Sequence, residues 1–207
     1  MRPCIKRTFD VMGVVVVLVV MAPVMTLVAL VILVTMGPPV LFRQERPGLK
    51  GRPFTVLKFR TMTDARDANG NPLSDRDRLT SVGRFLRMSS LDELPELFNV
   101  LRGEMSLVGP RPLLMQYLEH YTPEQARRHD VKPGMTGWAQ VKGRNVLGWE
   151  ERFQLDTWYV DHATLAVDLR VLLLTVGSVI TRHGISAKGH STMPRFKGTR
   201  GGEGETR

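Results

Sequence analysis

Two adjacent carboxylates, Asp92 and Glu93, lie in the stretch of this sequence that is best suited to chemistry, Ser89 to Pro95. Ser90 and Glu93 have the spacing of a capping box, which predicts that Asp92 falls in the first turn of a helix. Free backbone N–H groups and the helix dipole favour anions there, so the position also suits a phosphate. The alternative is that both carboxylates only complement the helix end. Pro95 disfavours a helix that starts directly after Ser90, so the regular helix is predicted to begin at Asp92 or later.

Positive charges surround this acidic pair in the sequence. Arginine recognises phosphate through two parallel hydrogen bonds, and the prolines on either side of Arg111 restrict the backbone that presents it. Each cation alone could be a solvated surface charge, but together with two carboxylates they predict phosphoryl chemistry with a divalent metal. Magnesium takes one or two protein carboxylates, so Asp92 and Glu93 could divide the roles of nucleophile and metal ligand. The cations are Lys58, Arg60, Arg84, Arg87, Arg111, Lys142 and Arg144.

The elements that must position these residues follow a long apolar run. Residues 11–36 contain no Asp, Glu, Lys, Arg or His, and the run exceeds the roughly 20 residues with which a helix crosses a bilayer. It is also longer than the apolar region of a signal peptide, and Gly37, Pro38 and Pro39 stand where a cleavage pattern would follow. We therefore expect the segment to remain in the mature protein.

Two features of this run favour a helix that enters and leaves the membrane on the same side. Pro23 at its middle predicts a break or kink, because proline lacks a backbone donor and clashes with the preceding turn. Basic residues flank both ends, and a spanning helix would place one cluster on the wrong side. A single kinked transmembrane anchor is the alternative. The flanking cations are Arg2, Lys6, Arg7, Arg43, Arg46, Lys50 and Arg52.

The remaining chain shows short elements in succession. Residues 40–44 and 54–60 are apolar or alternating runs around a Pro-Gly turn and predict a β-hairpin. Residues 63–78 are polar and predict a loop, and the helical spacing over 82–101 is interrupted at Ser89 and Ser90. The other predictions are helices over 113–121, 123–129 (opened by Thr122 and Pro123), 149–161 and 165–182, an ordered loop over 132–145, and a basic tail over 188–207 with little to bury.

Composition limits the class of protein. With 207 residues, of which 43% are hydrophobic, the chain fits about one globular domain, which excludes a purely disordered chain and a large multidomain enzyme. The single cysteine, Cys4, cannot form an intramolecular disulfide. A net charge of +9 favours anionic partners. A membrane-anchored, non-enzymatic binder of anionic lipid or nucleic acid is the competing hypothesis, but aromatic residues are not interleaved with the basic ones, which disfavours nucleic acid.

Four motifs give the chain a resemblance to a known family. They are FRQERPGLKGRPFTVLKFRTM, SLDELPELFNVLRGEMSLVGPRPLL, RHDVKPGMTGWAQVKGRN and SAKGHSTMPRFKG. From Lys6 to Gly198 the chain resembles the small bacterial sugar transferases, which are monotopic polyprenyl-phosphate phosphoglycosyl transferases. It is similar to the minimal members of this family, the undecaprenyl-phosphate N,N'-diacetylbacillosamine 1-phosphate transferases.

The resemblance implies a reaction at the cytoplasmic face of the bacterial inner membrane. The carboxylate matching Asp92 attacks the β-phosphate of a UDP-sugar, expected to be an N-acetylated amino sugar, and UMP leaves. Undecaprenyl phosphate then accepts the phosphosugar in a ping-pong reaction, the first membrane step of glycoconjugate synthesis. Glu93 matches a ligand of Mg2+, the implied cofactor, and Arg87 and Arg111 match phosphate-contacting arginines. Lys58 and Arg60 are further candidates for phosphate binding.

Together, the patterns and the resemblance predict an α+β, mainly helical fold. It comprises a re-entrant membrane helix broken at Pro23, a β-hairpin, amphipathic interfacial helices and a compact cytoplasmic catalytic domain. The predicted division is 1–39, 40–187 and 188–207. Ala22 precedes the membrane proline where several family members have serine, so the predicted break depends on Pro23 and the flanking charges.

Two weaker candidates for binding the nucleotide or the sugar are Arg144 and Asp156. Trp149 and Tyr159, in the same part of the sequence, are interpreted as core or interfacial aromatics. The expected partners are a UDP-sugar, undecaprenyl phosphate and membrane lipid, without nucleic acid. A dimer is left open, and no motif identifies the sugar.

Overall fold

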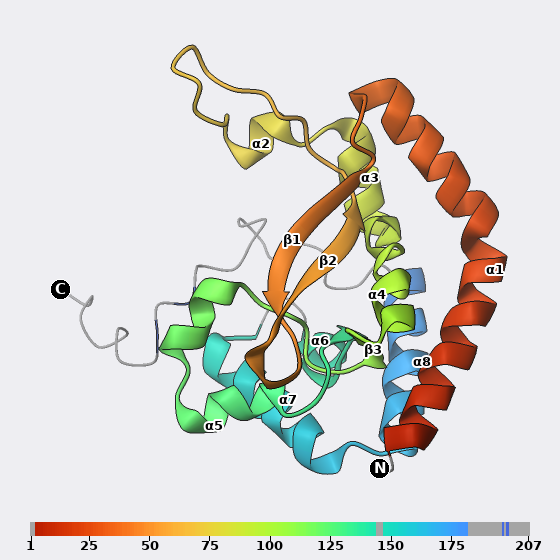
Figure 1. The fold of residues 1–207 in the computed structure, drawn as a ribbon, viewed down its shortest axis with the longest axis vertical. Coiled ribbons are helices and arrows are strands. Elements are labelled where there is room, and N and C mark those ends of the chain that lie inside the picture. The colour runs from red at the N-terminus through yellow and green to blue at the C-terminus, as the bar shows by residue number, and fades with distance from the viewer. Residues whose placement is uncertain (1–2, 144–146, 182–195, 197, 199–207) are drawn as a thin grey trace.

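Helices make up most of the secondary structure in the computed structural model, which describes residues 3–143, 147–181, 196 and 198 (Figure 1). Within these residues two small sheets accompany the helices, and the predicted mainly helical α+β class is confirmed. The α-helices are α1 (Pro3–Met36), α2 (Asp75–Arg78), α3 (Ser81–Ser89), α4 (Glu96–Arg102), α5 (Pro123–Ala126), α6 (Trp138–Gly143), α7 (Trp149–His162) and α8 (Leu165–Thr181). The 3-10 helices are η1 (Leu49–Gly51), η2 (Leu91–Glu93), η3 (Met115–His120) and η4 (Arg127–His129), and the strands are β1 (Leu41–Pro47), β2 (Pro53–Phe59), β3 (Ser106–Val108) and β4 (Gly134–Thr136).

The apolar run forms α1, which lies along one side of the molecule and curves over the rest of the fold (Figure 1). Among the described residues it is the one helix long and apolar enough to cross a membrane. The helix continues through Pro23, so the predicted interruption at this residue is wrong. The hydroxyl of Thr26 donates to the carbonyl oxygen of Ala22 at 2.9 Å. Such a bond beside a proline bends a helix while the backbone stays helical.

Only a stripe of α1 packs against the protein. Val14 belongs to the main core, and Val28 and Ile32 belong to a second cluster that contains Phe59, the last residue of β2. On the other side Val19 is 72% exposed and Val34 is 84% exposed. A continuous apolar surface of this size marks a membrane or protein contact.

Charged groups fix both ends of α1 to the body of the protein. Near its start, Nζ of Lys6 lies 2.7 Å from a carboxylate oxygen of the fully buried Asp168 on α8. Tyr159 on α7 donates its hydroxyl to the other oxygen of Asp168 at 2.7 Å. At the far end, the guanidinium of Arg60 donates to the carbonyl oxygens of Met36, Gly37 and Pro38. Both ends of the helix are therefore held by contacts with residues that follow it in the chain.

The predicted β-hairpin is confirmed, with a longer first strand than the sequence indicates. β1 and β2 pair antiparallel from Leu41 opposite Phe59 to Pro47 opposite Pro53. The buried side chain of Asn99 joins this hairpin to α4: its Oδ1 accepts from the backbone N–H of Leu57 at 3.0 Å. The amide of Asn99 also donates to a carbonyl oxygen of β2 at 2.7 Å.

The predicted interruption between α3 and α4 is confirmed, but its geometry differs from a capping box. Ser90 has the left-handed conformation (φ 57°) and ends α3, and its side chain makes no capping bond to η2. The capping box predicted between Ser90 and Glu93 is therefore wrong, because the backbone at Ser90 turns away from the N-cap geometry. α4 begins only at Glu96 with Pro95 as its N-cap, as a proline without an N–H donor favours. Asp92 and Glu93 lie in the 3-10 turn before it.

The predicted loop over 132–145 contains a strand and a helix. β4 pairs parallel with β3, and α6 follows directly. The glycines that indicate a loop allow backbones to approach closely. A Cβ on Gly134 would lie 2.1 Å from the backbone nitrogen of Gly109, and one on Gly137 would lie 2.2 Å from the carbonyl oxygen of Gly109. The prediction was wrong here because glycine serves packing at these positions.

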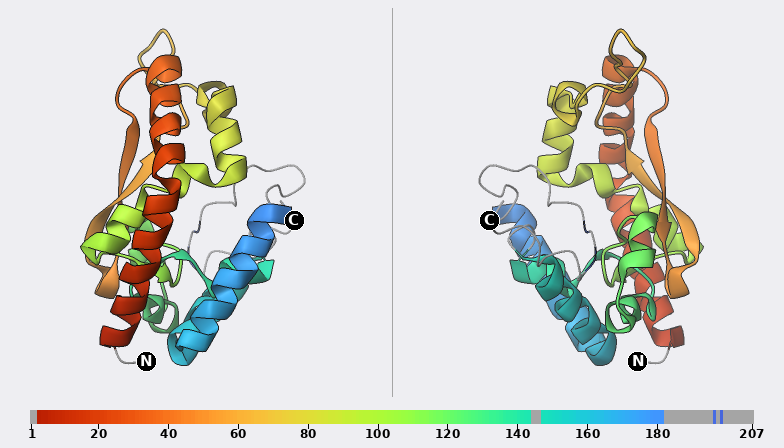
Figure 2. Two further views of the ribbon diagram at one scale, coloured as in Figure 1. Left: turned by 90° about the vertical axis from the view of Figure 1, so that its right-hand side faces the viewer. Right: turned by 90° about the vertical axis from the view of Figure 1, so that its left-hand side faces the viewer.

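The helices predicted for the C-terminal half are largely confirmed. α7 and α8 match their predicted ranges, and α5 opens with the capping box of Thr122 and Gln125. The helix predicted over 113–121 is instead a 3-10 helix over 115–120. α1 and α8 lie close together near the start of α1 and diverge toward the end of α8 (Figure 2).

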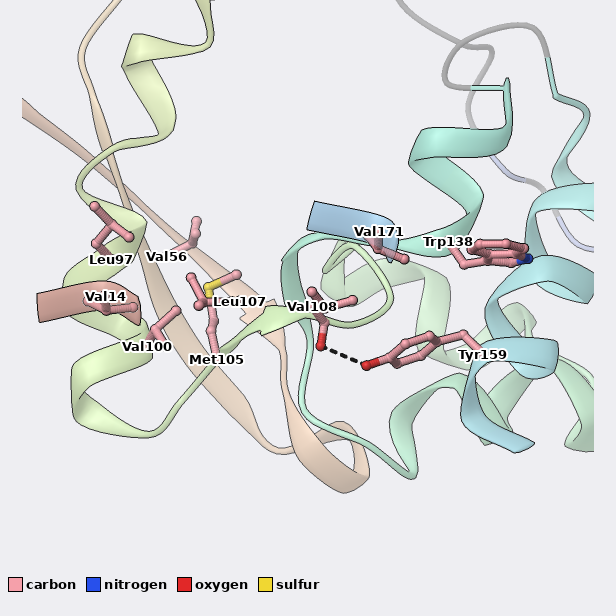
Figure 3. Packing of buried hydrophobic residues seen from close by; sticks show 10 residues of the cluster. All are labelled: Val14, Val56, Leu97, Val100, Met105, Leu107, Val108, Trp138, Tyr159 and Val171. Atoms are coloured by element: carbon pink, nitrogen blue, oxygen red, sulfur yellow. Dashed lines mark hydrogen bonds between the residues drawn. The ribbon is translucent and has the colours of Figure 1, made fainter. Parts of the chain in front are cut away.

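The main core brings together side chains from α1, β2, α4, β3, α6, α7 and α8 (Figure 3). Tyr159 is 2% exposed and its hydroxyl oxygen lies 3.1 Å from the carbonyl oxygen of Val108, in agreement with its interpretation as a core aromatic. Phe196 is buried against Tyr117 and Phe153, although the tail was predicted to have little to bury. The rest of the predicted tail, apart from Gly198, lies outside the described residues. The buried core residues are Val14, Val56, Leu97, Val100, Met105, Leu107, Val108, Trp138, Tyr159 and Val171.

Candidate active site

Glu93 is fixed by two cations that come from different elements. Nζ of Lys58, on β2, lies 2.7 Å from its Oε1, and the guanidinium of Arg111 donates to the same oxygen. A second contact, from Nη1 of Arg111 to Oε2, is longer at 3.5 Å. Burial alone would raise the pKa of Glu93, but Arg111 and Lys58 hold that pKa well below its usual value. Glu93 is therefore an ionised and oriented carboxylate.

Asp92 has a different environment from its neighbour. Its half-buried carboxylate makes no hydrogen bond or ion pair with any residue that the structure describes. Burial and the charge of Glu93 raise the pKa of Asp92 to about 6, against the opposing charges of Lys58, Arg111 and Arg87. A carboxylate that is ionised near neutral pH and has no fixed partner is available as a nucleophile.

Glu96 is a third carboxylate at this site, and sequence reasoning missed it. It is the first residue of α4, is 2% exposed, and its Oε1 lies 3.0 Å from Nζ of Lys58. Burial and the charge of Glu93 raise the pKa of Glu96 to about 7. Lys58 thus bridges two carboxylates of different acidity. The spacing of Glu93 and Glu96 by three residues was the available signal, since such residues share a helix face.

Arg87 reaches the same site from the end of α3. Its Nε donates to Oγ1 of Thr61 at 3.0 Å, and the side chain is exposed at the edge of the site. α3 comes this close because Gly83 lies against the backbone of Thr61, where a Cβ would be 1.8 Å from the carbonyl oxygen. The structure therefore brings Arg87, Lys58, Arg111, Asp92 and Glu93 together.

Arg60 is not brought to this site. It is 7% exposed and its guanidinium caps the C-terminal carbonyl groups of α1. This arrangement is favourable because the last carbonyl groups of a helix lack partners and carry partial negative charge. The structure thus gives Arg60 a contact with the end of α1, and the predicted phosphate contact finds no support in its position.

Asp156 also lies away from the open part of the site. It is 3% exposed and accepts hydrogen bonds from the buried Arg128 at 2.7 and 3.1 Å. Burial raises the pKa of Asp156, and Arg128 opposes this. Nη2 of Arg128 also donates to the carbonyl oxygen of Arg111 at 2.8 Å. Asp156 therefore supports the segment that carries Arg111, and the predicted nucleotide contact finds no support in its position. Arg144, the other weak candidate, lies outside the described residues.

A cavity of about 620 Å³ adjoins the carboxylates. Its charged lining includes Arg87, Glu93 and Arg111 together with Arg152 of α7, a cation that sequence reasoning missed. Apolar side chains also line the cavity, among them residues of α1 and α8. Asp92 itself is not part of the lining, although its neighbours Leu91 and Glu93 are. The volume is in the range of small-molecule sites, and the cavity offers both charged and apolar side chains.

The residues at the site fit a magnesium ion that is shared with a substrate. No group of three or more metal-binding side chains occurs among the described residues. Oε1 of Glu93 is used by Lys58 and Arg111, whereas Oε2 has only the long contact at 3.5 Å and keeps acceptor capacity. One carboxylate with a free oxygen suffices for Mg2+ when phosphate oxygens and water complete the shell.

Known proteins resemble this chain over most of its length. Residues 1–182 match the family model described as bacterial sugar transferase. The uncharacterized sugar transferase EpsL of Bacillus subtilis is 52% identical over 195 residues, which cover 94% of this chain and 96% of that protein. A UDP-glucose:undecaprenyl-phosphate glucose-1-phosphate transferase of Caulobacter vibrioides is 43% identical over 186 residues, or 85% of this chain and 70% of that protein.

A third relative is longer than this chain. The undecaprenyl-phosphate galactose phosphotransferase of Salmonella typhimurium is 39% identical over 198 residues, which cover 87% of this chain and 41% of that protein. The family model and the first two relatives match most of the sequence, including the segment that holds Asp92 and Glu93. This chain therefore belongs to the bacterial sugar transferase family.

Proposed function

We propose that this protein moves a sugar 1-phosphate from a UDP-sugar to undecaprenyl phosphate. The names of the Caulobacter and Salmonella relatives describe transfers of this kind to that lipid. The observation that carries the proposal is the contrast between two adjacent carboxylates. Asp92 has no fixed partner, whereas Glu93 is bound by Lys58 and Arg111. This contrast suits a nucleophile beside a metal ligand.

In the first step, Asp92 attacks the UDP-sugar. A carboxylate oxygen forms a bond to the β-phosphorus, and the bond from this phosphorus to the bridging oxygen breaks. UMP leaves with the electron pair, and the phosphosugar remains on Asp92. Arg87 and Arg111 bind phosphate oxygens and stabilise the charge that develops on the leaving group. Their approach to Asp92 also favours its ionised form.

In the second step, an oxygen of undecaprenyl phosphate bonds to the same phosphorus. The bond to Asp92 breaks, the carboxylate is regenerated, and undecaprenyl diphosphate-sugar is the product. A covalent intermediate allows a water-soluble and a lipid substrate to use one site in turn, which predicts ping-pong kinetics.

Glu93 is the proposed ligand of Mg2+, through Oε2. When bound, the ion supplies electrostatic stabilisation of the phosphate charge. Lys58 and Arg111 hold the Glu93 carboxylate in a single orientation for this role.

Release of UMP tests the reaction. Protein with Mg2+ and undecaprenyl phosphate should release UMP from at least one member of a UDP-sugar panel, and no release from any member would contradict the proposal.

Asp92→Asn should abolish turnover and prevent trapping of a labelled phosphosugar on the protein. Glu93→Gln should lose Mg2+-dependent activity while folding normally. An active Asp92→Asn variant would refute the assigned nucleophile.

The same panel tests the sugar. The expectation of an N-acetylated amino sugar remains a prediction, whereas the names of the Caulobacter and Salmonella relatives specify glucose and galactose. The panel should therefore include UDP-glucose, UDP-galactose and their N-acetylated amino counterparts. The sugar with the highest kcat/KM identifies the donor.

We also propose that both ends of α1 lie on the cytoplasmic side of the inner membrane. One domain binds both ends, through Lys6 with Asp168 and through Arg60 with the final carbonyl groups. A helix that crossed the bilayer upright would separate these contacts.

Cysteine labelling tests this topology. The exposed Cys4 reports on the start of α1, and Arg43→Cys in a Cys4→Ser background reports on the end of α1. An impermeant maleimide should label both from the same side, and labelling from opposite sides would establish a single span.

A further inference from the structure

The cavity beside Glu93 is lined by two kinds of side chain. Its charged part includes Arg87, Arg111 and Arg152. Its apolar part includes Val17 and Met21 on α1 and Leu172 and Val176 on α8. An occupant that suits the whole cavity must therefore have an anionic head and an apolar chain.

The apolar lining that α1 and α8 supply is partly exposed. Val17 is 38% exposed and Val176 is 58% exposed, although both line the cavity. Deeper in the cavity, Leu97 is 2% exposed and Leu107 is 9% exposed. Figure 2 shows α1 and α8 moving apart toward the end of α8. Val17 belongs both to the lining and to the exposed apolar surface of α1, so a chain could pass from a lipid phase into the cavity along apolar side chains.

The lining disfavours a nucleotide base as the occupant of the apolar part of the cavity. Among the described residues that line the cavity, none is aromatic, so a base would have no ring on which to stack. Aliphatic side chains instead match an aliphatic chain, whose burial is favourable in proportion to the apolar area covered.

We propose that the phosphate-proximal isoprene units of the polyprenyl phosphate acceptor lie between α1 and α8. The phosphate then faces Arg87, Arg111 and Arg152, whose charge complements it. This proposal rests on the proposed function and adds to it the path of the lipid. It makes Arg152 of α7 a further phosphate-binding residue, and it gives the membrane helix a direct part in substrate binding.

A matched pair of substitutions on α8 tests the path of the chain. Val176 lines the cavity, whereas Leu173 is 74% exposed and does not. Both side chains are exposed enough to be enlarged without disturbing the core. Val176→Trp should lower kcat/KM for undecaprenyl phosphate about tenfold, because the indole fills the space of the chain. Leu173→Trp should match the unchanged protein.

Exchange of labelled UMP into the UDP-sugar, measured without acceptor, reports the first step alone. This exchange should be the same in Val176→Trp and Leu173→Trp. If Val176→Trp lowers exchange as much as transfer, the cavity holds the donor and the proposal is wrong. Equal transfer in both variants would also overturn it. Absence of UMP exchange and of transfer in the unchanged protein would refute the proposed function instead.

A photoreactive lipid gives a measurement that does not depend on turnover. A polyprenyl phosphate with a diazirine in its first isoprene units should label α1 and α8, and excess undecaprenyl phosphate should compete. Val176→Trp should reduce labelling and Leu173→Trp should not. Labelling confined to other helices would contradict the proposed path.

Discussion

The buried guanidinium of Arg128 donates a hydrogen bond of 2.8 Å to the backbone carbonyl oxygen of Arg111. Asp156 neutralises Arg128 through two further hydrogen bonds. Arg111 in turn binds Glu93, so a chain of contacts leads from α7 to the proposed catalytic carboxylates. Arg128 touches no reacting group in this arrangement and is a positioning residue.

Arg128→Lys should lower kcat about tenfold or more, because lysine cannot bind Asp156 and the Arg111 carbonyl with the same fixed fork. KM for the UDP-sugar should change less than kcat, because Arg111 is expected to stabilise the transition state more than the bound UDP-sugar. Arg128→Gln should also lower the free energy of unfolding by about 3 kcal/mol, since it leaves Asp156 buried without a counter-charge. Kinetics and thermal unfolding of the two variants check these expectations.

The neighbouring Arg127 provides a control on the same turn. It pairs with Glu124 and Asp161 at the surface. Arg127→Lys should therefore leave kcat and Tm essentially unchanged. Equal losses in Arg127→Lys and Arg128→Lys would show that the contact with Arg111 has no special role.

A second prediction concerns Lys58, which bridges Glu93 and Glu96. Lys58→Met should reduce activity and stability, because two nearly buried carboxylates then face each other with less compensating charge. Adding Glu96→Gln should restore part of the stability, since it removes one of the two acids. Unfolding of the two single variants and the double variant forms a double-mutant cycle. Additive losses would show that the two residues are not coupled.

Gly83→Ala tests the approach of α3 to the end of the hairpin. The added Cβ would lie 1.8 Å from the carbonyl oxygen of Thr61, so α3 must shift. We expect a loss of about 2 to 3 kcal/mol in the free energy of unfolding and a lower kcat, because Arg87 contacts Thr61. Gly177→Ala on α8 is the control: its Cβ would meet nothing within 4 Å, and alanine favours a helix. A Gly83→Ala variant as stable as Gly177→Ala would contradict this interpretation.

Local patterns were sufficient to predict much of this fold. The hairpin, the interruption between α3 and α4, and α5, α7 and α8 follow from periodicity, turn residues and caps. Four predicted site residues that come together with Asp92 (Lys58, Arg87, Glu93 and Arg111) were indicated by their charge, and Arg111 also by the prolines on either side of it. These signals lie within short stretches of sequence.

What the sequence did not reveal depends on contacts between distant segments. The parallel pairing of β3 and β4 requires the close backbone approach at Gly109 and Gly134, which single-sequence patterns interpret as a loop. Arg128 as the partner of Asp156 and the carbonyl groups bound by Arg60 could not be inferred, because each lies more than 20 residues away along the chain. Ser90 and Glu93 have the spacing of a capping box, but the left-handed backbone conformation of Ser90 prevents the capping hydrogen bond.

The last prediction is a dependence of stability on pH through His129. Burial, with the charge of Arg128, lowers the pKa of His129 to about 4 from 6.5. The unfolded chain then binds a proton between these values that the folded protein does not, so His129 lowers stability as the pH falls from about 6.5 to about 4. The loss should be on the order of 2 to 3 kcal/mol in acid.

His129→Gln should remove this loss, because glutamine does not titrate. The raised pKa of Glu96 acts in the opposite direction, since a folded carboxyl that keeps its proton gains stability as the pH falls through about 7. The informative quantity is therefore the difference in Tm between His129→Gln and the unchanged protein, measured in detergent from pH 7 to pH 4. The Tm of His129→Gln relative to the unchanged protein should rise as the pH falls. His162 is exposed, and His162→Gln should show no such rise. A constant difference for His129→Gln would show that the histidine is protonated as readily in the folded protein as in the unfolded chain.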